Sequence, residues 1–358
     1  MVEAISLEHL QPGNSSSTHQ AGRRARSRLE SARQRVAVVL GCSPKEICFT
    51  ASGSEANALA LKGAFDARPD LTKNRIVASA IEHPATLFAL EQLKGQGAEV
   101  VLVAPRPNGA VHLADIVPLL TQSTGLCSLM WANNETGVVQ PVDGLAEECR
   151  QRKIIFHCDA VQLIGKSRSS IAAVDADLLT FSAHKFGGPS GAGVLRIRRA
   201  VELRSLVPGH QESGRRGGSP NLLAIEAAAL ALEVSVSNSV ENCEHLEGLR
   251  DQFERNVLQR VSGASVQGAS SDRLVNTSNI TFSGVDGEAL LIALDLQGIC
   301  ASSGAACASG SLKPSHVLLA MGLSSRDAKS SLRFSIGNST SSQEVEQVVE
   351  AIAQFNPA

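Results

Sequence analysis

The sequence contains no tyrosine and one tryptophan, and aromatic residues make up 3% of its 358 positions. Proteins that stack on nucleic-acid bases depend on aromatic side chains, so a base-stacking function is not expected. The formal net charge of −2 also provides no field that would attract nucleic acid or an anionic membrane. With 43% hydrophobic and 19% charged residues, the composition is that of an ordinary globular protein, and the length suggests two domains.

Signal-peptide and membrane-spanning patterns are lacking as well. Residues 1–10 carry glutamates and have no cationic start followed by an apolar run. The most apolar stretch, 222–234, contains Glu226 and Glu233 and is too short to cross a bilayer. We therefore expect a cytoplasmic protein that has neither nucleic acid nor a membrane as a partner.

The eight cysteines show no C-x-x-C pair and no disulfide-framework spacing. In a reducing compartment most of them are expected to be small buried hydrophobic residues, and we include Cys158 and Cys300 among these. Cys307 differs, because it lies in a run of small residues, 301–311, of the kind that forms a loop. No metal site is expected.

Candidate strands alternate with helical patterns over the first 200 residues. The strands are predicted at 47–50, 75–80, 99–104, 125–132, 153–157, 178–181 and 193–197. This alternation predicts an α/β fold with a mostly parallel, doubly wound sheet, in which ligands bind at the carboxyl ends of the strands. Residues 222–259 are expected to form one long helix. It leads to a smaller α/β domain with strands at 278–282 and 332–336, and helices at 287–296 and from 342. We place the domains at 1–238 and 239–358.

Residues 23–40 carry six arginines around an apolar stripe with helical spacing. A nucleic-acid face is disfavoured because the overall charge is near neutral. A solvated or subunit-facing helix is the better explanation.

Small and polar residues gather at three predicted strand ends. In the turn Thr50-Ala-Ser-Gly-Ser-Glu-Ala-Asn57, Gly53 would let the backbone approach a phosphate, and Ser54 adds a hydroxyl. Ser52 and Glu55 also fit a helix capping box, which is the better explanation of this turn alone. Asp159 ends another strand, with Gln162 three residues on.

The third strand end carries Ser182, His184 and Lys185 inside a glycine-rich bend. A lysine between buried segments must be paired, lower its pKa or form an imine. An anion cradle, a carboxylate for a ring nitrogen and a lysine for an aldehyde are the three groups that pyridoxal 5'-phosphate (PLP) requires. The combination predicts a PLP site and is far more specific than any of its parts.

The sequence resembles the cysteine desulfurases, in the class V aminotransferase group of fold-type I PLP-dependent enzymes. The matching runs follow the family order along nearly the whole chain. They are 52–57, Glu82-His-Pro-Ala85, Asn133-Asn-Glu-Thr-Gly137, Asp159-Ala-Val-Gln162, Ser182-Ala-His-Lys185, 209–219, Ala301-Ser-Ser-Gly-Ala-Ala-Cys307 and Leu332-Arg-Phe-Ser-Ile-Gly337. Serines at 54 and 219 stand where the family has threonines and keep the hydroxyl.

The resemblance implies a role for each matching residue. Lys185 would form the Schiff base and move protons, Asp159 would pair with the ring nitrogen, and Gln162 would bond the ring hydroxyl. His83 would stack on the ring and act as acid–base. Gly53, Ser54, Ser182 and His184 would hold the phosphate, with Ser219 reaching in from the partner subunit of a homodimer. Asn134 and Arg333 would hold the substrate carboxylate, and Asn134 would also lie in the cofactor site.

The resemblance further implies that Cys307 attacks the sulfur of PLP-bound L-cysteine. Alanine would leave and a persulfide would remain on Cys307. The loop would then carry that sulfur to an acceptor, such as an iron–sulfur scaffold protein or a thiolation partner.

Three alternatives stay open at the level of sequence. A selenocysteine lyase or related β-lyase would use the same site. A truncated paralogue that binds PLP without turnover is suggested by the family's Asn-Asn-Ala-Thr-Thr segment, of whose surroundings only Gly13-Asn-Ser-Ser-Ser17 is recognisable. An ordinary aminotransferase is least favoured, because transamination has no use for a cysteine loop.

Overall fold

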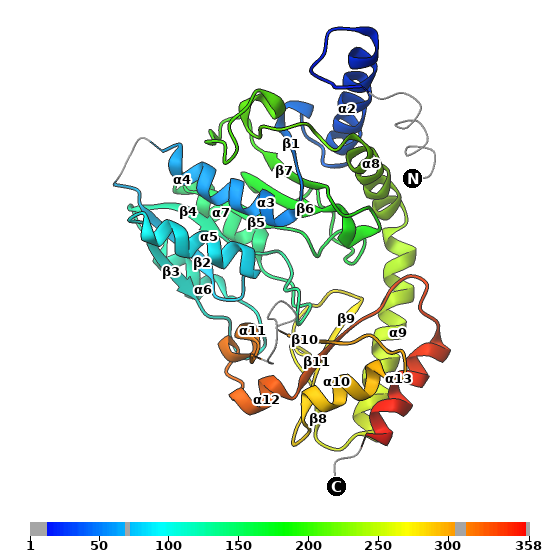
Figure 1. Cartoon of the computed structure of the whole chain (residues 1–358). Helices are drawn as coiled ribbons and strands as arrows, with labels where there is room; N and C mark the ends of the chain where they lie inside the picture. The colour runs from blue at the N-terminus through cyan, green and yellow to red at the C-terminus, as the bar shows by residue number, and fades with distance from the viewer. Residues whose placement is uncertain (1–12, 69–71, 305–312, 356–358) are drawn as a thin grey trace.

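A seven-stranded sheet forms the centre of the larger part of the molecule (Figure 1). The computed structural model describes residues 13–68, 72–304 and 313–355. The strand order is β1-β7-β6-β5-β4-β2-β3. The bounds are β1 Ile47–Thr50, β2 Arg75–Ser79, β3 Glu99–Val103, β4 Thr124–Ser128, β5 Ile155–Asp159, β6 Leu178–Ser182 and β7 Gly193–Ile197.

The pairing of these strands confirms the predicted mostly parallel sheet. β2 to β6 pair parallel with one another, whereas β7 runs antiparallel to both β1 and β6. The ends of two predicted strands move by two residues or more. β4 ends at Ser128, four residues early, although the N–H groups of Leu129 and Trp131 still donate to the His157 and Asp159 carbonyls of β5. β5 begins at Ile155 and extends to Asp159, which places that carboxylate on the strand itself.

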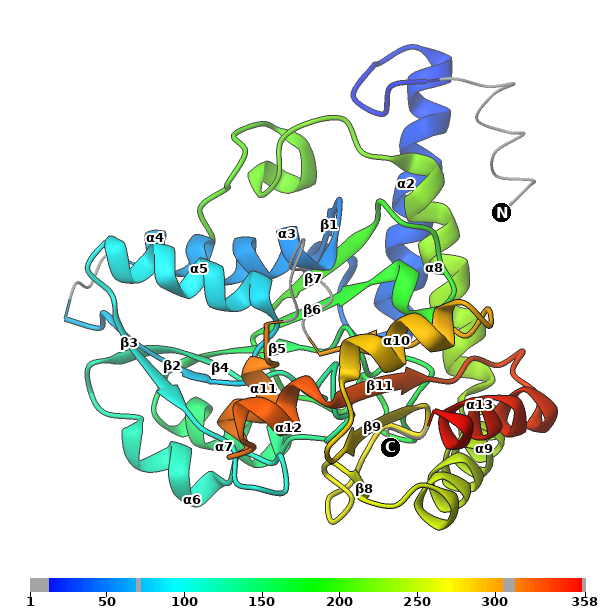
Figure 2. The same cartoon turned by 60° about the horizontal axis from the view of Figure 1, so that its bottom comes forward.

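Both faces of the large sheet are covered, because neighbouring strand residues point in opposite directions. Ile76 and Leu178 belong to the core beneath the helices α3 (Gly53–Ala58) and α5 (Pro84–Gly95), whereas Val77 and Leu179 belong to the opposite core. That second core is closed by α2 (Gln20–Val39), α7 (Val142–Gln151) and α8 (Leu222–Ser237). This arrangement is the expected doubly wound layering (Figure 2).

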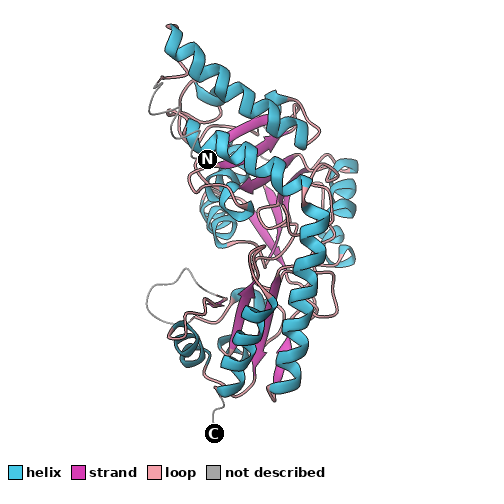
Figure 3. Cartoon of the chain, turned by 90° about the vertical axis from the view of Figure 1, so that its right-hand side faces the viewer, coloured by secondary structure: helices cyan, strands magenta, loops and turns pink. Residues whose placement is uncertain are grey.

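The small part of the chain is built on an antiparallel sheet of order β10-β11-β9-β8. Its strands are β8 Ala264–Val266, β9 Thr277–Phe282, β10 Ser302–Ser303 and β11 Ser331–Ser335. The helices α9 (Ser239–Arg260), α10 (Gly287–Asp295) and α13 (Ser342–Gln354) contribute to its core. Figure 3 shows its strands as a second group along the long axis of the molecule. The predicted smaller α/β unit is confirmed, while the domain boundary at 238/239 stays a prediction.

The expectation of one long helix over 222–259 is wrong. α8 ends at Ser237 and α9 begins at Ser239, with a bend of 72° at the break. The apolar α8 packs on the large core, and α9 must turn to reach the small sheet. Among the described residues, no single helix has the length and apolar character to cross a membrane. α8 and α9 would meet that test only if counted together across their bend.

Three of the six arginines of α2, Arg23, Arg24 and Arg26, are exposed, as expected of a solvated helix, whereas the other three bind carboxylates of their own chain. Arg28 and Arg35 pair with Glu226 and Glu233 of α8 at 2.5 Å. Arg33 is buried and binds Glu212 through two hydrogen bonds of 2.7 and 2.8 Å. These three arginines therefore hold α2 against α8 and against the segment that contains Glu212.

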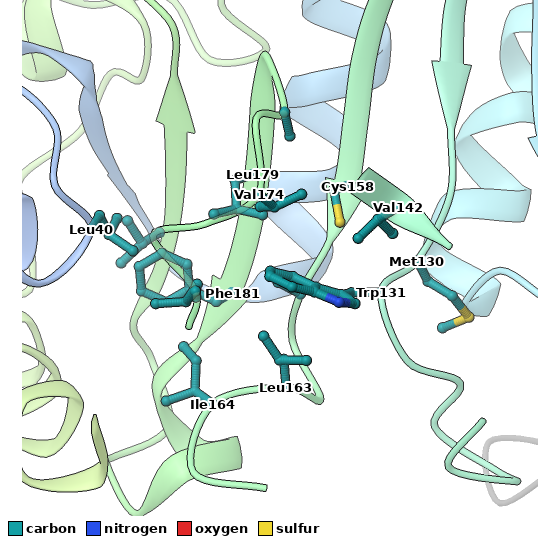
Figure 4. Close-up of a cluster of buried hydrophobic side chains, with 14 of the residues drawn as sticks. Leu40, Met130, Trp131, Val142, Cys158, Leu163, Ile164, Val174, Leu179 and Phe181 are labelled. Carbon is teal, nitrogen blue, oxygen red and sulfur yellow. The ribbon is translucent and has the colours of Figure 1, made fainter. Parts of the chain in front are cut away.

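The cysteine prediction holds for most described positions and fails for one. Cys158 is fully buried, beside Trp131 and Val142 in the large core (Figure 4). Cys300 is exposed, contrary to the expectation. It follows the turn after α10, where Gly298 adopts a positive φ, and precedes the edge strand β10, so the core does not cover it.

Candidate active site

Asp159 lies at the carboxyl end of β5 and is 4% exposed. The Val161 N–H donates to its Oδ1 at 2.9 Å, and the Asn57 amide donates to its Oδ2 at 2.7 Å. Burial raises the pKa of Asp159, and both of these bonds and the charge of His83 oppose that rise. Two donors hold the carboxylate in one orientation at the point where the sequence predicts the partner of a ring nitrogen.

The turn before α3 serves as both a helix cap and a contact with the next strand end. The Ser52 hydroxyl accepts from Glu55 N and caps the helix, as expected. The Glu55 carboxylate accepts from Ala51 N in place of Ser52 N, so the capping box itself is incomplete. Gly53 is buried against β6, because a Cβ at this position would lie 3.1 Å from the Ser182 Cβ. The Ser54 side chain is exposed beside it. The turn and the end of β6 therefore share one location.

Lys185 lies in a 3₁₀ turn, Ala183–Phe186, that follows β6. The turn ends at Gly187, whose positive φ lets the chain reverse. Three residues before the lysine, Ser182 Oγ lies 3.0 Å from His184 Nδ1. Burial and the charges of Lys185 and Lys166 lower the pKa of His184. A neutral His184 can therefore share hydrogen bonds with Ser182 near pH 7.

His83 caps α5, with its Nδ1 accepting from Ala85 N at 3.1 Å. The neutral ring then carries its proton on Nε2. Burial lowers the pKa of His83, while the charge of Asp159 raises it and that of Lys185 lowers it. These interactions bring His83, Asp159 and Lys185 into one site, although their positions span 100 residues.

Arg333 and Asn134 join the large and small sheets at this site. Arg333, on β11, donates from Nη1 to the Asn134 carbonyl oxygen at 2.9 Å. The preceding Asn133 folds the backbone into a turn by accepting from the N–H groups of Glu135 and Thr136. The buried Asn134 Oδ1 has no hydrogen-bond partner among the described residues. Such an atom is satisfied only when a ligand or water supplies a donor.

Four further polar residues belong to this site and were assigned no role from the sequence: Asn57, Glu82, Glu135 and Lys166. Burial raises the pKa of Glu82 to about 8 and that of Glu135 to about 7. Burial and the charges of Lys185 and Arg333 lower the pKa of Lys166 to about 7. Asn57, Glu82 and Glu135 fall inside motifs quoted above, so position in a motif was the available signal. For Lys166 the one available signal was its position four residues after Gln162.

Gln162 joins the cluster through Lys166, whereas Ser219 and Cys307 are not brought to it within the described residues. Gln162 Oε1 accepts from Lys166 Nζ at 3.0 Å. Ser219 is exposed and has no hydrogen bond to another predicted site residue within the described ranges. Cys307 lies outside the described residues.

The residues present fit PLP. Lys185 provides an amine, Asp159 a fixed and buried carboxylate, and Ser182, His184 and Ser54 polar groups around the Gly53 turn. Asn134 Oδ1 still needs a donor. The charges of Lys185 and Arg333 both act on Lys166, as expected where a phosphate and a substrate carboxylate bind.

Comparisons with known proteins agree with this geometry. The aminotransferase class-V family model matches residues 2–348. A cysteine desulfurase of Nostoc sp. is 39% identical over 96% of this chain and 86% of its own length. One of Enterobacter agglomerans is 40% identical over 98% of this chain and 88% of its own. The solved structure of a NifS-like protein superposes with a TM-score of 0.90 at 34% identity, covering 99% of this chain and 94% of that one. The chain therefore belongs to the aminotransferase class-V family of PLP-dependent enzymes, in the branch of the cysteine desulfurases.

Proposed function

We propose that this cysteine desulfurase converts L-cysteine to L-alanine with the residues at the strand ends and collects the sulfur on Cys307. The observation that carries the proposal is the meeting of His83, Asp159 and Lys185 at one site. Each comes from a different strand end of the large sheet, where α/β enzymes bind their ligands.

In this proposal Lys185 holds the cofactor and Asp159 pairs with its ring nitrogen. When bound, PLP supplies the electron sink for charge that develops at the substrate α-carbon. The carboxylate favours a protonated ring nitrogen, and its two donors from Val161 and Asn57 keep it oriented. Ser54, Ser182 and His184 hold the phosphate around Gly53, and Gln162 bonds the ring oxygen.

Arg333 and Asn134 bind the carboxylate of L-cysteine. A guanidinium can bind a carboxylate through two parallel hydrogen bonds, and the bond to the Asn134 carbonyl already fixes its position. His83, which has a lowered pKa, and the Lys185 amine exchange protons with the substrate near neutral pH. Proton transfer to the β-carbon completes alanine.

The sulfur step is a transfer between two thiols. The Cys307 thiolate attacks the substrate sulfur, the carbon–sulfur bond breaks, and its electron pair goes to the β-carbon, which takes a proton. The result is L-alanine and a persulfide on Cys307, so no oxidant is needed. The persulfide then passes to a thiol acceptor, such as an iron–sulfur scaffold protein or a thiolation partner.

Two further parts of the proposal concern the setting of the reaction. A homodimer would bring Ser219 of one subunit to the phosphate of the other, and the exposure of Ser219 in this chain supports that arrangement. We also propose that the enzyme works in the cytoplasm, where reduced thiols are available as sulfur acceptors.

The test adds one equivalent of L-cysteine to PLP-loaded protein without a reductant. Mass spectrometry should find one added sulfur atom on Cys307, together with about one equivalent of alanine. Cys307→Ala should abolish sulfur transfer and sulfide release, whereas the exposed Cys300→Ser serves as the matched control and should transfer sulfur normally.

Other outcomes distinguish the alternatives. Sulfur found on Cys300 with none on Cys307 would overturn the role given to Cys307. Faster alanine release from selenocysteine with no persulfide would favour a selenocysteine lyase. PLP binding without alanine would favour the paralogue that does not turn over.

A further inference from the structure

Lys166 lies four residues beyond Gln162 in the segment that follows β5. Its backbone is fixed at both ends, because its N–H donates to the Leu163 carbonyl at 3.0 Å and its carbonyl accepts from Val275 N at 3.1 Å. Gly165, with φ +72°, lets the chain turn just before it. Val275 belongs to the segment that enters β9, so Lys166 is tied to both sheets.

The Lys166 ammonium donates to Gln162 Oε1 at 3.0 Å. Its pKa of about 7 leaves the ammonium, which has donors and no acceptor, as the main form below neutral pH, and the carbonyl end of a glutamine amide only accepts. The contact therefore decides which end of the amide faces Lys166. The Nε2 end, with its two N–H donors, is left for the other side.

The surroundings of Lys166 belong to the active site. The charges of Lys185 and Arg333 both act on Lys166, and the charge of Lys166 acts on His184. Lys166 thus lies among the groups that hold the cofactor and the substrate, although no motif had indicated it.

We propose that Lys166 is a positioning residue that fixes the Gln162 amide with its N–H end toward the ring oxygen of the cofactor. This inference rests on the proposed function, because the ring oxygen belongs to PLP. That oxygen carries negative charge in its phenolate form, so it needs a donor. A flipped amide would place a carbonyl oxygen there instead, and the two acceptors would repel each other.

Removing the Lys166 ammonium should change the orientation of the Gln162 amide. In Lys166→Met the amide loses its orienting partner, and the donor at the ring oxygen is present only part of the time. A donor favours the deprotonated, more negative form, so its loss raises the pH at which the lysine-bound cofactor loses its proton. The worth of one hydrogen bond corresponds to an upward shift of about 0.5 to 1 pH unit.

The experiment measures the visible absorbance of PLP-loaded protein against pH and the dissociation constant of PLP from titration of the apo-protein. Lys166→Met should raise the absorbance midpoint and weaken PLP binding about threefold to tenfold. Lys166→Arg keeps a donor and should restore both values. Lys94→Met, at an exposed lysine of α5, is the matched control and should change neither. Thermal unfolding of each apo-protein tests whether the variants fold.

A double-variant comparison separates positioning from a simple charge effect. In a Gln162→Leu background, Lys166→Met should add little, because the amide that it orients is absent. A full shift in that background would overturn the inference, and so would an unchanged midpoint in Lys166→Met alone. The unmodified protein is measured first. If it binds no PLP or shows no visible absorbance with PLP, the proposed function fails and the inference about Lys166 is not what has been tested.

Discussion

Asn57 donates a 2.7 Å hydrogen bond from its amide to Asp159 Oδ2, joining two buried side chains that are 102 positions apart in the sequence. One residue comes from the helix after β1 and the other from the end of β5. This bond and the one from Val161 fix both oxygens of the carboxylate on which the proposed cofactor chemistry depends.

Asn57→Leu removes this donor while keeping a side chain of similar size. A hydrogen bond to a charged group contributes about 1.5–3 kcal/mol, so PLP affinity should fall about tenfold to a hundredfold. Titration of apo-protein with PLP measures the effect. Asn74→Ala, which removes a side-chain amide that donates to the Gly97 carbonyl at the surface, is the control. An unchanged PLP affinity in Asn57→Leu would show that the Asp159 orientation does not depend on this bond.

Arg333→Lys replaces the planar fork by a single ammonium. We expect the KM for L-cysteine to rise tenfold or more, with a smaller loss in kcat and little change in PLP affinity, because the guanidinium binds the substrate carboxylate. Steady-state alanine formation measures both constants. Arg326→Lys, on the exposed side of α12 (Ser325–Lys329), provides the comparison. A fall confined to kcat would argue against carboxylate binding.

Glu212→Gln should destabilise the fold by about 3 kcal/mol, because it removes the buried charge partner of Arg33. Glu212 also accepts from Phe49 N of β1, so its loss affects the edge of the large sheet. Urea unfolding measures the change. The exposed Glu30, 3.1 Å from the same arginine, offers the matched variant Glu30→Gln, which should change stability by less than about 0.5 kcal/mol. The double variant Arg33→Met with Glu212→Leu should recover much of the lost stability.

His157 is fully buried between Ser128 Oγ at 2.9 Å and Thr180 Oγ1 at 3.2 Å, and burial lowers its pKa to about 3. In the unfolded chain His157 therefore binds a proton near pH 6.5, whereas in the folded chain it stays neutral until the pH approaches about 3. Below pH 6.5 this single group reduces the free energy of unfolding by about 1.4 kcal/mol per pH unit, until the pH approaches the folded pKa.

Urea unfolding at several pH values between 7 and 4 tests this dependence against His157→Gln. The variant removes the titrating group, so its stability should decline less steeply with acid than that of the unmodified protein. Parallel declines would show that His157 is protonated in both states. Comparison of the two proteins is essential, because the buried Glu82, with a pKa raised to about 8, acts in the opposite direction as the pH rises from 4.5 to 8.

The sequence by itself determined the sheet and the kind of chemistry. β-rich runs between helical patterns indicate a parallel sheet wherever the runs are short and buried, as at 76–78 and 178–181. Polar residues after such strands, at Asp159 and at 182–185, must meet at one edge because parallel strands end together. These are local patterns, so the sequence carries them directly.

Only the tertiary structure decided which groups act on one another. The Asn57 bond to Asp159 and the influence of Lys185 on His83 join segments that no sequence spacing relates. The break between α8 and α9 was hidden because the residues on both sides favour helix, and packing on two separate cores decides where it bends. The ion pairs of Arg28 and Arg35 with α8 could likewise not be predicted from the sequence, because their carboxylates lie 198 positions away. Local propensity determines where helices and strands form. The hydrogen-bond and ion-pair partners of a side chain depend on burial and charge, which are set only once the chain is folded.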